Sequence, residues 1–562
     1  MLKHNLLALS LALALSACGK SGDTPPTTST AAAVQNPVVA EHSKHWWQDA
    51  VVYQIWPRSF YDTNGDGIGD FKGIQAKLPY LQDLGINAIW LTPMFEAPSY
   101  HGYDFTQFYQ VEQDYGSMAD FEQLVQDAKS KNINVILDLV INHISSEHDW
   151  FKRSAAGEAP YKDYFIWRDE LPQDGWGPAW SQEVKPEAVW HWNEQRKAYY
   201  YAAFGASQPD LNLTHPDVIA EMKKAAKFWL DKGVAGFRLD AVRYAIENGP
   251  QERADTQQTI DYWVDFTQYV KSINPEAYLV AEAWVDIPVA ARYWGQGKGL
   301  DAGFDFDFGY KVLELLNAGA QNAEFGTMSE AKTTGNILQD NFEQRKASGA
   351  PFEFFSPFLT NHDQPRLAWQ LGQDFNKAKL AAAMLFASPG TTYIYYGEEI
   401  ALTQASDKEH MHRRSPMFWD GSNQAGFTAA DKVWVQSDNL FPPQGDTSWW
   451  APFLAQQLKA ATTVAAQQQD PKSVWSLYKF LIAQKKRPEF GIAGDYQAEL
   501  LAEGKLLKLT RTLGEQQSVM LLNLSAEAQA IPAALVPAGL SISWQEDDTP
   551  ELGAYQLQIW QS

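Results

Sequence analysis

Short continuous apolar runs alternate along the chain with longer segments in which apolar side chains recur every three or four residues. The run at 51–56 is typical of a strand that is buried on both faces of a sheet. In the next segment, from Ile74 to Leu84, the apolar residues fall on one side of a helix, and Gly85 suits its end. The pattern therefore predicts strand–helix units from about residue 46 onward.

The same alternation continues for most of the chain. The strand candidates are the runs at 51–56, 88–93, 135–140, 236–244, 278–283, 304–308, 354–360 and 392–396. Helical spacing is clear between several of them, for example from Phe121 to Ala128 and from Val218 to Trp229. Parallel strands separated by helices in this number predict an α/β protein with a closed (β/α)8 TIM barrel. In such barrels the functional residues lie on loops that follow the carboxyl ends of the strands.

Two segments break this regularity. Residues 144–213 are rich in Trp, contain Pro and are too long for an ordinary loop, so they predict a subdomain inserted after the third strand, overhanging the barrel mouth. The barrel then comprises 45–143 and 214–488. From 489 to 562 the pattern changes to short runs of period two, with Gly514 and Gly539 between them, which predicts a C-terminal antiparallel β domain.

The N-terminus has the features of an export signal. An apolar run follows Lys3 and is too short to cross a bilayer, which predicts a signal peptide at 1–17. The run ends at Cys18, which is the only cysteine of the chain. Residues 15–19 resemble a bacterial lipobox, and this resemblance implies lipidation of Cys18. An ordinary cleavable signal is the alternative.

The segment that follows the cysteine predicts a tether. Residues 18–44 are rich in Ser, Thr, Pro and Ala and have few large apolar side chains, as in a flexible linker. With the lipobox, this predicts an exported bacterial lipoprotein at an outer membrane, at the cell surface or in the periplasm. A single cysteine also leaves the exported domain without disulfides.

Composition narrows the classes of partner. The net charge of −23 over 562 residues argues against nucleic acid and against direct adsorption to an anionic membrane. The 22 Trp, 24 Tyr and 29 Phe supply flat rings that suit the apolar faces of sugars, although many of them belong to the core. We therefore expect a monomer with a neutral substrate, attached to a membrane only through a lipid anchor.

Polar side chains follow several of the predicted strands, and these are the candidates for chemistry. They are Asp138, Asn142, His143, Arg238, Asp240, Glu282, His362 and Asp363. Arg238 and Asp240 are two apart on a strand and so share a face, where the guanidinium favours the ionised carboxylate. Such a carboxylate is either a nucleophile or half of a structural ion pair. Convergence of several carboxylates at one end of the barrel favours an active site.

These residues also carry a family resemblance. The segments at 138–143 (DLVINH), 236–240 (GFRLD), 281–284 (AEAW) and 360–363 (TNHD) resemble, in order, the conserved regions of the α-amylase family of glycoside hydrolases. The segment at 208–212 (QPDLN) resembles the marker at the end of that family's inserted subdomain. The resemblance extends from about residue 46 to the C-terminus.

The resemblance implies a role for each matching residue. Asp240 matches the nucleophile, Glu282 the general acid/base with a raised pKa, and Asp363 the carboxylate that stabilises the transition state. Retention of configuration by double displacement requires two carboxylates about 5–5.5 Å apart. The residues expected to bind substrate are His101, Tyr103, His143, Arg238, His362 and Arg414.

A second signal lies between the first strand and the first helix. Residues 62–70 place oxygen ligands at alternate positions of a Gly-rich loop, as a hard cation such as Ca²⁺ requires, but lack the downstream Glu of an EF-hand. The loop resembles the calcium loop of the oligosaccharide-cleaving branch of the family. This implies the ligands Asp62, Asn64, Asp66, Ile68 (through its carbonyl) and Asp70. The alternative is a solvated loop of Asx turns.

The motifs give mixed indications of specificity. The calcium loop and residues 208–212 are similar to exo-acting α-glucosidases, whereas Tyr100–Tyr103 is similar to endo-acting α-amylases. Exo-acting members tend to have Asp at the position of Tyr100, and members strict for α-1,6 bonds tend to have Val at that of Ala241. The resemblance thus implies α-1,4 cleavage of starch-derived glucans and maltooligosaccharides.

Other activities stay open. An exo-acting α-glucosidase or oligo-1,6-glucosidase, or a transglycosylase on short maltooligosaccharides, would use the same residues. A non-catalytic glucan-binding protein is disfavoured because Asp240, Glu282 and Asp363 are all present.

Overall fold

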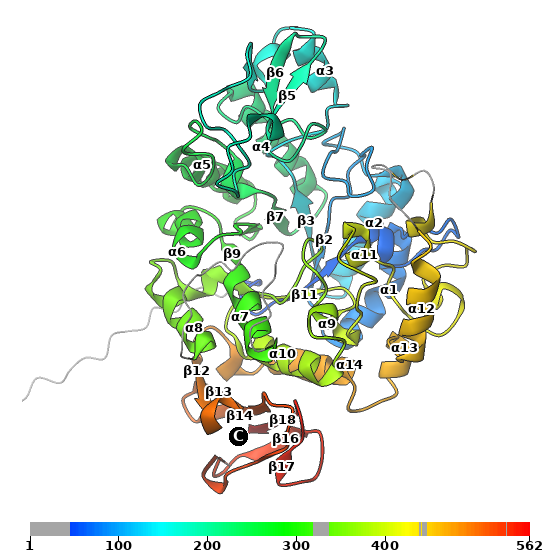
Figure 1. Ribbon diagram of the computed structural model, residues 1–562, viewed down its shortest axis with the longest axis vertical. Coiled ribbons are helices and arrows are strands. Elements are labelled where there is room, and N and C mark those ends of the chain that lie inside the picture. Colours follow the sequence, from blue (N-terminus) through cyan, green and yellow to red (C-terminus); the bar gives the residue numbers. More distant parts are fainter. Residues whose placement is uncertain (1–44, 318–335, 438–439, 441–446, 536) are drawn as a thin grey trace, which may run out of the picture. The chain divides into compact units, whose positions relative to one another are not determined.

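The computed structural model describes residues 45–317, 336–437, 440, 447–535 and 537–562 (Figure 1). The predicted signal peptide at 1–17, Cys18 and the tether up to residue 44 lie outside the described residues. Within the described part of the chain, no helix combines the length and the apolar character that crossing a membrane requires.

Eight parallel strands form a nearly closed barrel, as the sequence predicts. They are hydrogen-bonded in the order β10-β9-β8-β7-β3-β2-β1-β11. Their bounds are β1 (Val51–Ile55), β2 (Ala88–Leu91), β3 (Asn134–Leu139), β7 (Gly236–Leu239), β8 (Tyr278–Ala281), β9 (Ala302–Asp305), β10 (Phe355–Pro357) and β11 (Thr392–Tyr395). The first and last strands of this order, β10 and β11, lie near each other at the remaining seam.

The barrel strands are largely apolar because both of their faces are buried. Val52 and Trp90 belong to the apolar cluster that fills the barrel interior. Their chain neighbours Val51 and Ile89 belong to the larger cluster between the strands and the helices. Side chains alternate along a strand, so successive residues supply the two sides of the barrel wall.

The helices surround the strands. The longer ones are α1 (Phe71–Leu84), α2 (Met118–Ser130), α4 (Pro216–Asp231), α5 (Gln257–Ile273), α7 (Phe306–Asn317), α8 (Ile337–Ala347), α10 (Phe375–Ala387), α12 (Trp450–Lys459) and α14 (Val474–Gln484). The shorter ones are α3 (Asp149–Ala155), α6 (Ile287–Ala290), α9 (Leu367–Gln370), α11 (His410–Arg413) and α13 (Val464–Gln467). In α1 the predicted face is buried, the side chain of Asp70 accepts a hydrogen bond from the Gly73 N–H, and Gly85 ends the helix with φ 101°.

Two predicted strands continue past the ends of the observed ones into helical structure. The run at 236–244 covers β7 and then a 3-10 turn at Val242–Tyr244. The apolar run at 304–308 covers the end of β9 and the start of α7. Asp305 Oδ1 accepts a hydrogen bond from the N–H of Phe308 at 3.0 Å, which holds the chain as it turns from strand into helix. A short apolar run has no periodicity that distinguishes a strand from the start of a buried helix. The prediction of a strand over the whole of 304–308 was therefore wrong.

The inserted segment has a small sheet of its own. The antiparallel strands β4 (Trp167–Arg168), β6 (Ala198–Tyr201) and β5 (Trp190–Asn193) form it in that order. Trp176, Trp190 and Tyr201 are buried together in a separate apolar cluster. The segment therefore contains the Trp-rich core that its composition indicates.

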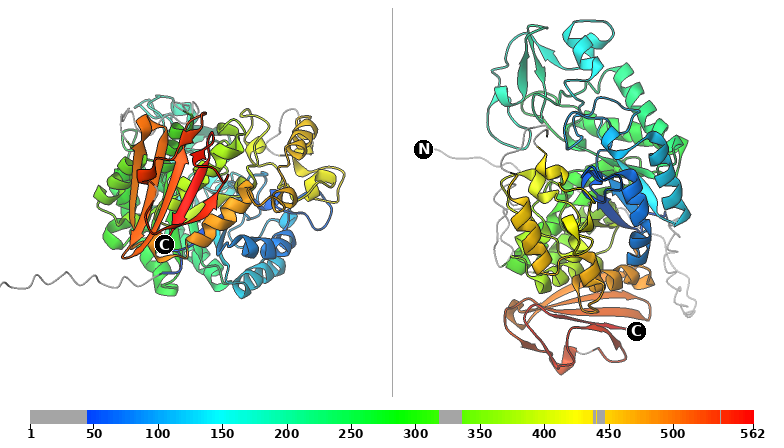
Figure 2. Two further views of the ribbon diagram at one scale, coloured as in Figure 1. Left: turned by 90° about the horizontal axis from the view of Figure 1, so that it is seen from below. Right: turned by 90° about the vertical axis from the view of Figure 1, so that its right-hand side faces the viewer.

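The C-terminal residues form the predicted antiparallel sheet, next to α10 and α14 and away from the small sheet (Figure 2). Its order is β12 (Asp495–Leu501), β13 (Leu506–Leu513), β14 (Gln516–Asn523), β18 (Leu557–Gln561) and β16 (Ser541–Gln545), beside a pair formed by β15 (Gln529–Ala530) and β17 (Glu551–Leu552). Arg511 of β13 is buried and donates to the carbonyl of Ala387 at 2.8 Å, which joins this sheet to the end of α10.

Candidate active site

The centre of the site is the guanidinium of Arg238, which β7 delivers fully buried. Its Nη1 lies 2.7 Å from Asp138 Oδ1 and 2.6 Å from Asp240 Oδ1. Its Nη2 lies 2.6 Å from Glu282 Oε1. The carboxylates follow or belong to the adjacent strands β3, β7 and β8, so strand order alone brings these groups to one cation.

Glu282 follows β8, and its surroundings favour the protonated acid. Burial raises the pKa of Glu282 to about 8; the guanidinium of Arg238 opposes this shift, while the carboxylates of Asp240 and Asp363 add to it. The Glu282 Oε2 accepts a hydrogen bond from the N–H of Ala241 at 3.1 Å. Ala241 has φ 52° in the left-handed region, at a cost of about 1 kcal/mol for a residue with Cβ. The hydrogen bond from Ala241 fixes Glu282 next to the residue that follows Asp240.

Asp138 positions Arg238, a role that the sequence analysis did not assign. It is buried, and its Oδ2 accepts a hydrogen bond from the Tyr103 hydroxyl at 3.2 Å. Burial raises the pKa of Asp138 to about 7, and the neighbouring Arg238 opposes this shift. In the sequence, the feature that could have indicated this role was an Asp within a strand whose other residues are largely apolar.

Asp363 lies in the turn after β10 and is held by two basic side chains. Its Oδ1 accepts from Arg414 Nη2 at 2.9 Å, and its Oδ2 lies 3.0 Å from His362 Nε2. Although burial acts to raise it, His362 and Arg414 keep the pKa of Asp363 well below its ordinary value. Asp363 is therefore ionised, in contrast to Glu282.

Tyr103 connects these two groups of charges. Its ring stacks on that of His362, with centroids 5.6 Å apart and an interplanar angle of 6°. The other ring nitrogen of His362, Nδ1, lies 2.6 Å from Gln54 Nε2. Gln54 was not identified from the sequence, although it is the single polar residue of β1. Burial lowers the pKa of His362, and the neighbouring Asp363 opposes this shift.

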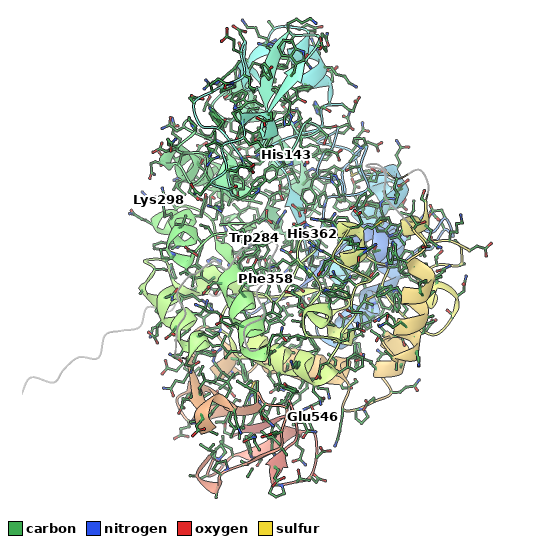
Figure 3. All side chains as sticks on the ribbon, viewed as in Figure 1. His143, Trp284, Lys298, Phe358, His362 and Glu546 are labelled. Atoms are coloured by element: carbon green, nitrogen blue, oxygen red, sulfur yellow. The ribbon has the colours of Figure 1, made fainter. Side chains whose placement is uncertain are left out.

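The two other predicted histidines line the same region. His143 Nε2 lies 3.0 Å from Gln208 Nε2, which brings the end of the inserted segment to the site. His101 Nδ1 accepts a hydrogen bond from the N–H of Tyr103 at 3.2 Å. Burial lowers the pKa of His143, and burial with the nearby Arg414 lowers the pKa of His101 to about 3. In the view of Figure 3, His143 lies below the small sheet, and Trp284 and His362 lie farther down, toward the barrel helices. Glu546 lies at the C-terminal sheet, away from these three residues.

The predicted calcium loop lies between β1 and α1. Asp62 and Asp70 are buried, and Asp62 accepts hydrogen bonds from the backbone N–H groups of Asn64, Gly65 and Gly67. Among the described residues, no group of three or more His, Cys, Asp or Glu is arranged to hold a metal ion. The loop's donors are nevertheless all oxygen, and a carboxylate that accepts N–H bonds keeps lone pairs for a cation. The donor atoms are thus of the type that a hard cation takes, while the hydrogen bonds within the loop are those of Asx turns.

Comparisons with known proteins find relatives over most of the chain. A family model described as alpha amylase, catalytic domain, matches residues 54–490. The chain is 34% identical to Alpha-amylase 3 of Dictyoglomus thermophilum over 443 residues, or 78% of each chain. It is 30% identical to an Oligo-1,6-glucosidase of Parageobacillus thermoglucosidasius over 581 residues, or 92% of this chain and 98% of the relative.

Solved structures of related proteins superpose on almost the whole chain. The alpha-amylase from H. orenii superposes with a TM-score of 0.73 at 30% identity, covering 93% of this chain and all of that one. The trehalose-6-phosphate hydrolase of Bacillus licheniformis superposes with a TM-score of 0.75 at 27% identity, covering 92% of this chain and all of that one.

The raised pKa of Glu282 predicts a stability difference that depends on pH. The folded state favours the neutral acid, so wild type loses stability as the pH rises from the ordinary value near 4.5 through about 8. Glu282→Gln keeps the shape and cannot ionise. We expect its melting temperature, relative to wild type, to rise by several degrees between pH 5 and pH 9.

The control is Glu515→Gln, at an exposed turn between two strands of the C-terminal sheet. Its melting temperature should stay parallel to that of wild type over the whole range. A Glu282→Gln curve that is also parallel to wild type would show that burial does not raise this pKa.

Proposed function

The chain belongs to the α-amylase family of glycoside hydrolases. From that premise we propose that it is a retaining enzyme that cleaves α-1,4-glucosidic bonds of starch-derived glucans and maltooligosaccharides. The observation that carries the proposal is that one guanidinium, Arg238, contacts both Asp240 and Glu282 at 2.6 Å. A single cation thus fixes a nucleophile and a proton donor beside each other.

In the first step the Asp240 carboxylate attacks the anomeric carbon of the cleaved sugar. Glu282 gives its proton to the glycosidic oxygen, so the bond to the leaving sugar breaks as the bond to Asp240 forms. A pKa of about 8 keeps Glu282 protonated at neutral pH, as this step requires. In the second step Glu282, now a carboxylate, takes a proton from water, and the resulting hydroxide displaces Asp240.

The ionised Asp363 supplies the third carboxylate. Its oxygens are suited to accept hydrogen bonds from sugar hydroxyls and to stabilise positive charge at the anomeric centre. Arg414 and His362 keep it ionised in a buried place where a carboxylate would otherwise take up a proton. We propose that Tyr103, His101 and His143 complete the binding of the cleaved sugar.

Two positions support action on α-1,4 bonds within chains. Ala241, after the proposed nucleophile, is small, where enzymes strict for α-1,6 bonds tend to have Val. Tyr100 occupies the position at which exo-acting members tend to have Asp, and its ring stacks on Trp434 at 5.4 Å. Exo action on short oligosaccharides is the second candidate, because relatives named Oligo-1,6-glucosidase and Maltase A1 align with 92% and 86% of the chain. Transfer to a second sugar is the third, since it shares the intermediate.

We also propose that the loop at 62–70 binds Ca²⁺ for stability. Asp62, Asn64, Asp66 and Asp70 would hold the ion with the carbonyl of Ile68. The loop packs against a distant segment, because the carbonyl of Gly67 accepts the N–H of Trp434 at 2.9 Å. A cation would neutralise the carboxylates of the loop and stiffen this contact.

We propose finally that the protein is a monomeric lipoprotein anchored at Cys18. The segment from 18 to 44 would hold the barrel away from the bilayer. A net charge of −23 would be repelled by an anionic surface, so attachment would depend on the lipid. An exported enzyme of this kind is placed to shorten glucans before uptake.

Removal of the proposed nucleophile tests the activity. Asp240→Asn should lower turnover of maltooligosaccharides by roughly 10⁴-fold or more with the fold intact, because the amide cannot attack. Asp261→Asn, on the exposed face of α5, is the control and should behave as wild type. More than a few per cent of activity in Asp240→Asn would refute its role.

The products of the wild type from starch and from maltotriose, followed with time, separate the candidates. Internal cleavage gives a mixture of shorter oligosaccharides from starch, and exo action gives only glucose at first. Chains longer than maltotriose would show transfer.

Calcium should change the melting temperature of the protein more than its catalytic rate. We expect the melting temperature to fall with a chelator and to rise with free Ca²⁺, because a ligand that binds only the folded state stabilises it. Asp62→Asn should remove much of this dependence. A melting temperature that is the same with chelator and with added Ca²⁺ would exclude the site.

Cell fractionation tests the anchor. In cells that express the full chain, wild type should be recovered with membranes and Cys18→Ser in the soluble fraction, because acyl chains give about 0.8 kcal/mol per buried methylene. Equal distribution of the two proteins would exclude lipidation.

A further inference from the structure

A tryptophan of the inserted segment is exposed without an evident structural reason. Among the described residues, large apolar side chains with strong exposure are Trp180 (56%), Val184 (66%), Trp192 (43%) and Ile542 (51%). Trp180 and Val184 lie on the same loop, so this loop presents apolar surface to solvent. An indole that served only the core would be buried, since burial of apolar area is favourable.

The loop that carries Trp180 is built to hold its shape. Its ends meet where the N–H of Lys185 donates to the carbonyl of Trp176 at 2.8 Å. Trp176 itself is buried in the apolar cluster of the inserted segment. A Cβ at Gly177 would lie 1.9 Å from the carbonyl oxygen of Glu183, so the loop is closely packed at its neck.

The loop is also fixed by the segment that follows the adjacent strand β7. Arg253, in the segment that follows β7, donates to the carbonyl of Pro178 at 3.1 Å and to that of Ser181 at 3.0 Å. These two residues flank the Ala179–Trp180 pair, so the indole is held on both sides. A rigid, exposed ring has already lost the conformational entropy that binding would otherwise cost.

The aromatic neighbours of Trp180 lead to the proposed active site. Its ring stacks on Phe204, with centroids 5.5 Å apart and 27° between planes, and meets the edge of Tyr244 at 6.1 Å. Phe204 lies 5.1 Å from the ring of His143. Tyr244 ends the short turn that follows Asp240. A chain of aromatic contacts therefore connects His143, in the candidate active site, with the exposed ring of Trp180.

We propose that Trp180 is a stacking platform for a glucosyl unit away from the one that Asp240 attacks, so that this enzyme favours long linear α-glucans over trisaccharides. The inference rests on the proposed function, because it adds a binding position to that site. Pyranose rings have apolar faces that pack on indole, and Phe204 and Tyr244 fix the ring orientation. A long chain can occupy the cleaved position and the platform together in more binding registers than a trisaccharide can.

The test compares Trp180→Ala with Trp192→Ala, which removes another exposed tryptophan of the same segment. Trp192 lies on β5 against Tyr199, at 5.0 Å. For Trp180→Ala we expect kcat/KM to fall about tenfold with maltoheptaose and less than twofold with maltotriose. Trp180→Phe should recover most of the loss, and Trp192→Ala should match wild type on both substrates. Equal losses on both substrates, no loss, or the same loss in Trp192→Ala would overturn the proposal.

A binding measurement separates this inference from the activity itself. In the Asp240→Asn background, calorimetric titration with maltoheptaose should show weaker binding when Trp180→Ala is added and unchanged binding when Trp192→Ala is added. If wild type cleaves no glucan, the proposed function fails. Binding that is the same with and without the indole would overturn the platform, whatever the activity.

Discussion

The buried guanidinium of Arg238 is the interaction on which the site depends. A cation in the barrel interior is stable only when carboxylates surround it, and three of them do so from three adjacent strands. More negative groups than one cation can balance then meet in a low dielectric. Burial raises the pKa values of Asp138 and Glu282 to about 7 and about 8, and the neighbouring carboxylates add to both shifts. Glu282 is thus kept as an acid by its burial and its carboxylate neighbours, against the opposing effect of Arg238.

A second cation, Arg414, keeps one of the carboxylates of the site ionised. Arg414 lies against Asp363, and its guanidinium also sits over the ring of Trp56 at 4.5 Å, which keeps it in place. Asp363 is therefore ionised a short distance from a carboxyl that is not. Tyr103 joins the two halves, because its hydroxyl bonds Asp138 and its ring stacks on His362. Environment, not residue type, gives these acidic side chains different protonation states.

The inserted segment contributes to the site through contacts with other parts of the barrel mouth. Gln208 reaches His143, and Asp210 pairs with His143 through a short bridge between backbones. Arg253, after β7, binds the loop of Trp180 in return. Segments that leave β3 and β7 are thereby interlocked above adjacent strands. The long insertion can contribute residues to the site because these hydrogen bonds hold it in place at several points.

The sequence by itself determined the barrel, most of its strands and helices, and which polar residues end the strands. Period and burial are local properties, so apolar runs and helical faces are visible in the chain, and Arg238 and Asp240 share a face because they are two apart. The run at 304–308 was assigned wrongly because a short apolar run has no period of its own. Only the tertiary structure decided that Asp138 supports Arg238, that Gln54 holds His362, and that Trp180 stands exposed beside Phe204. These relations join residues from 24 to 308 positions apart, and proximity of that kind depends on how the strands close into a barrel and not on local pattern.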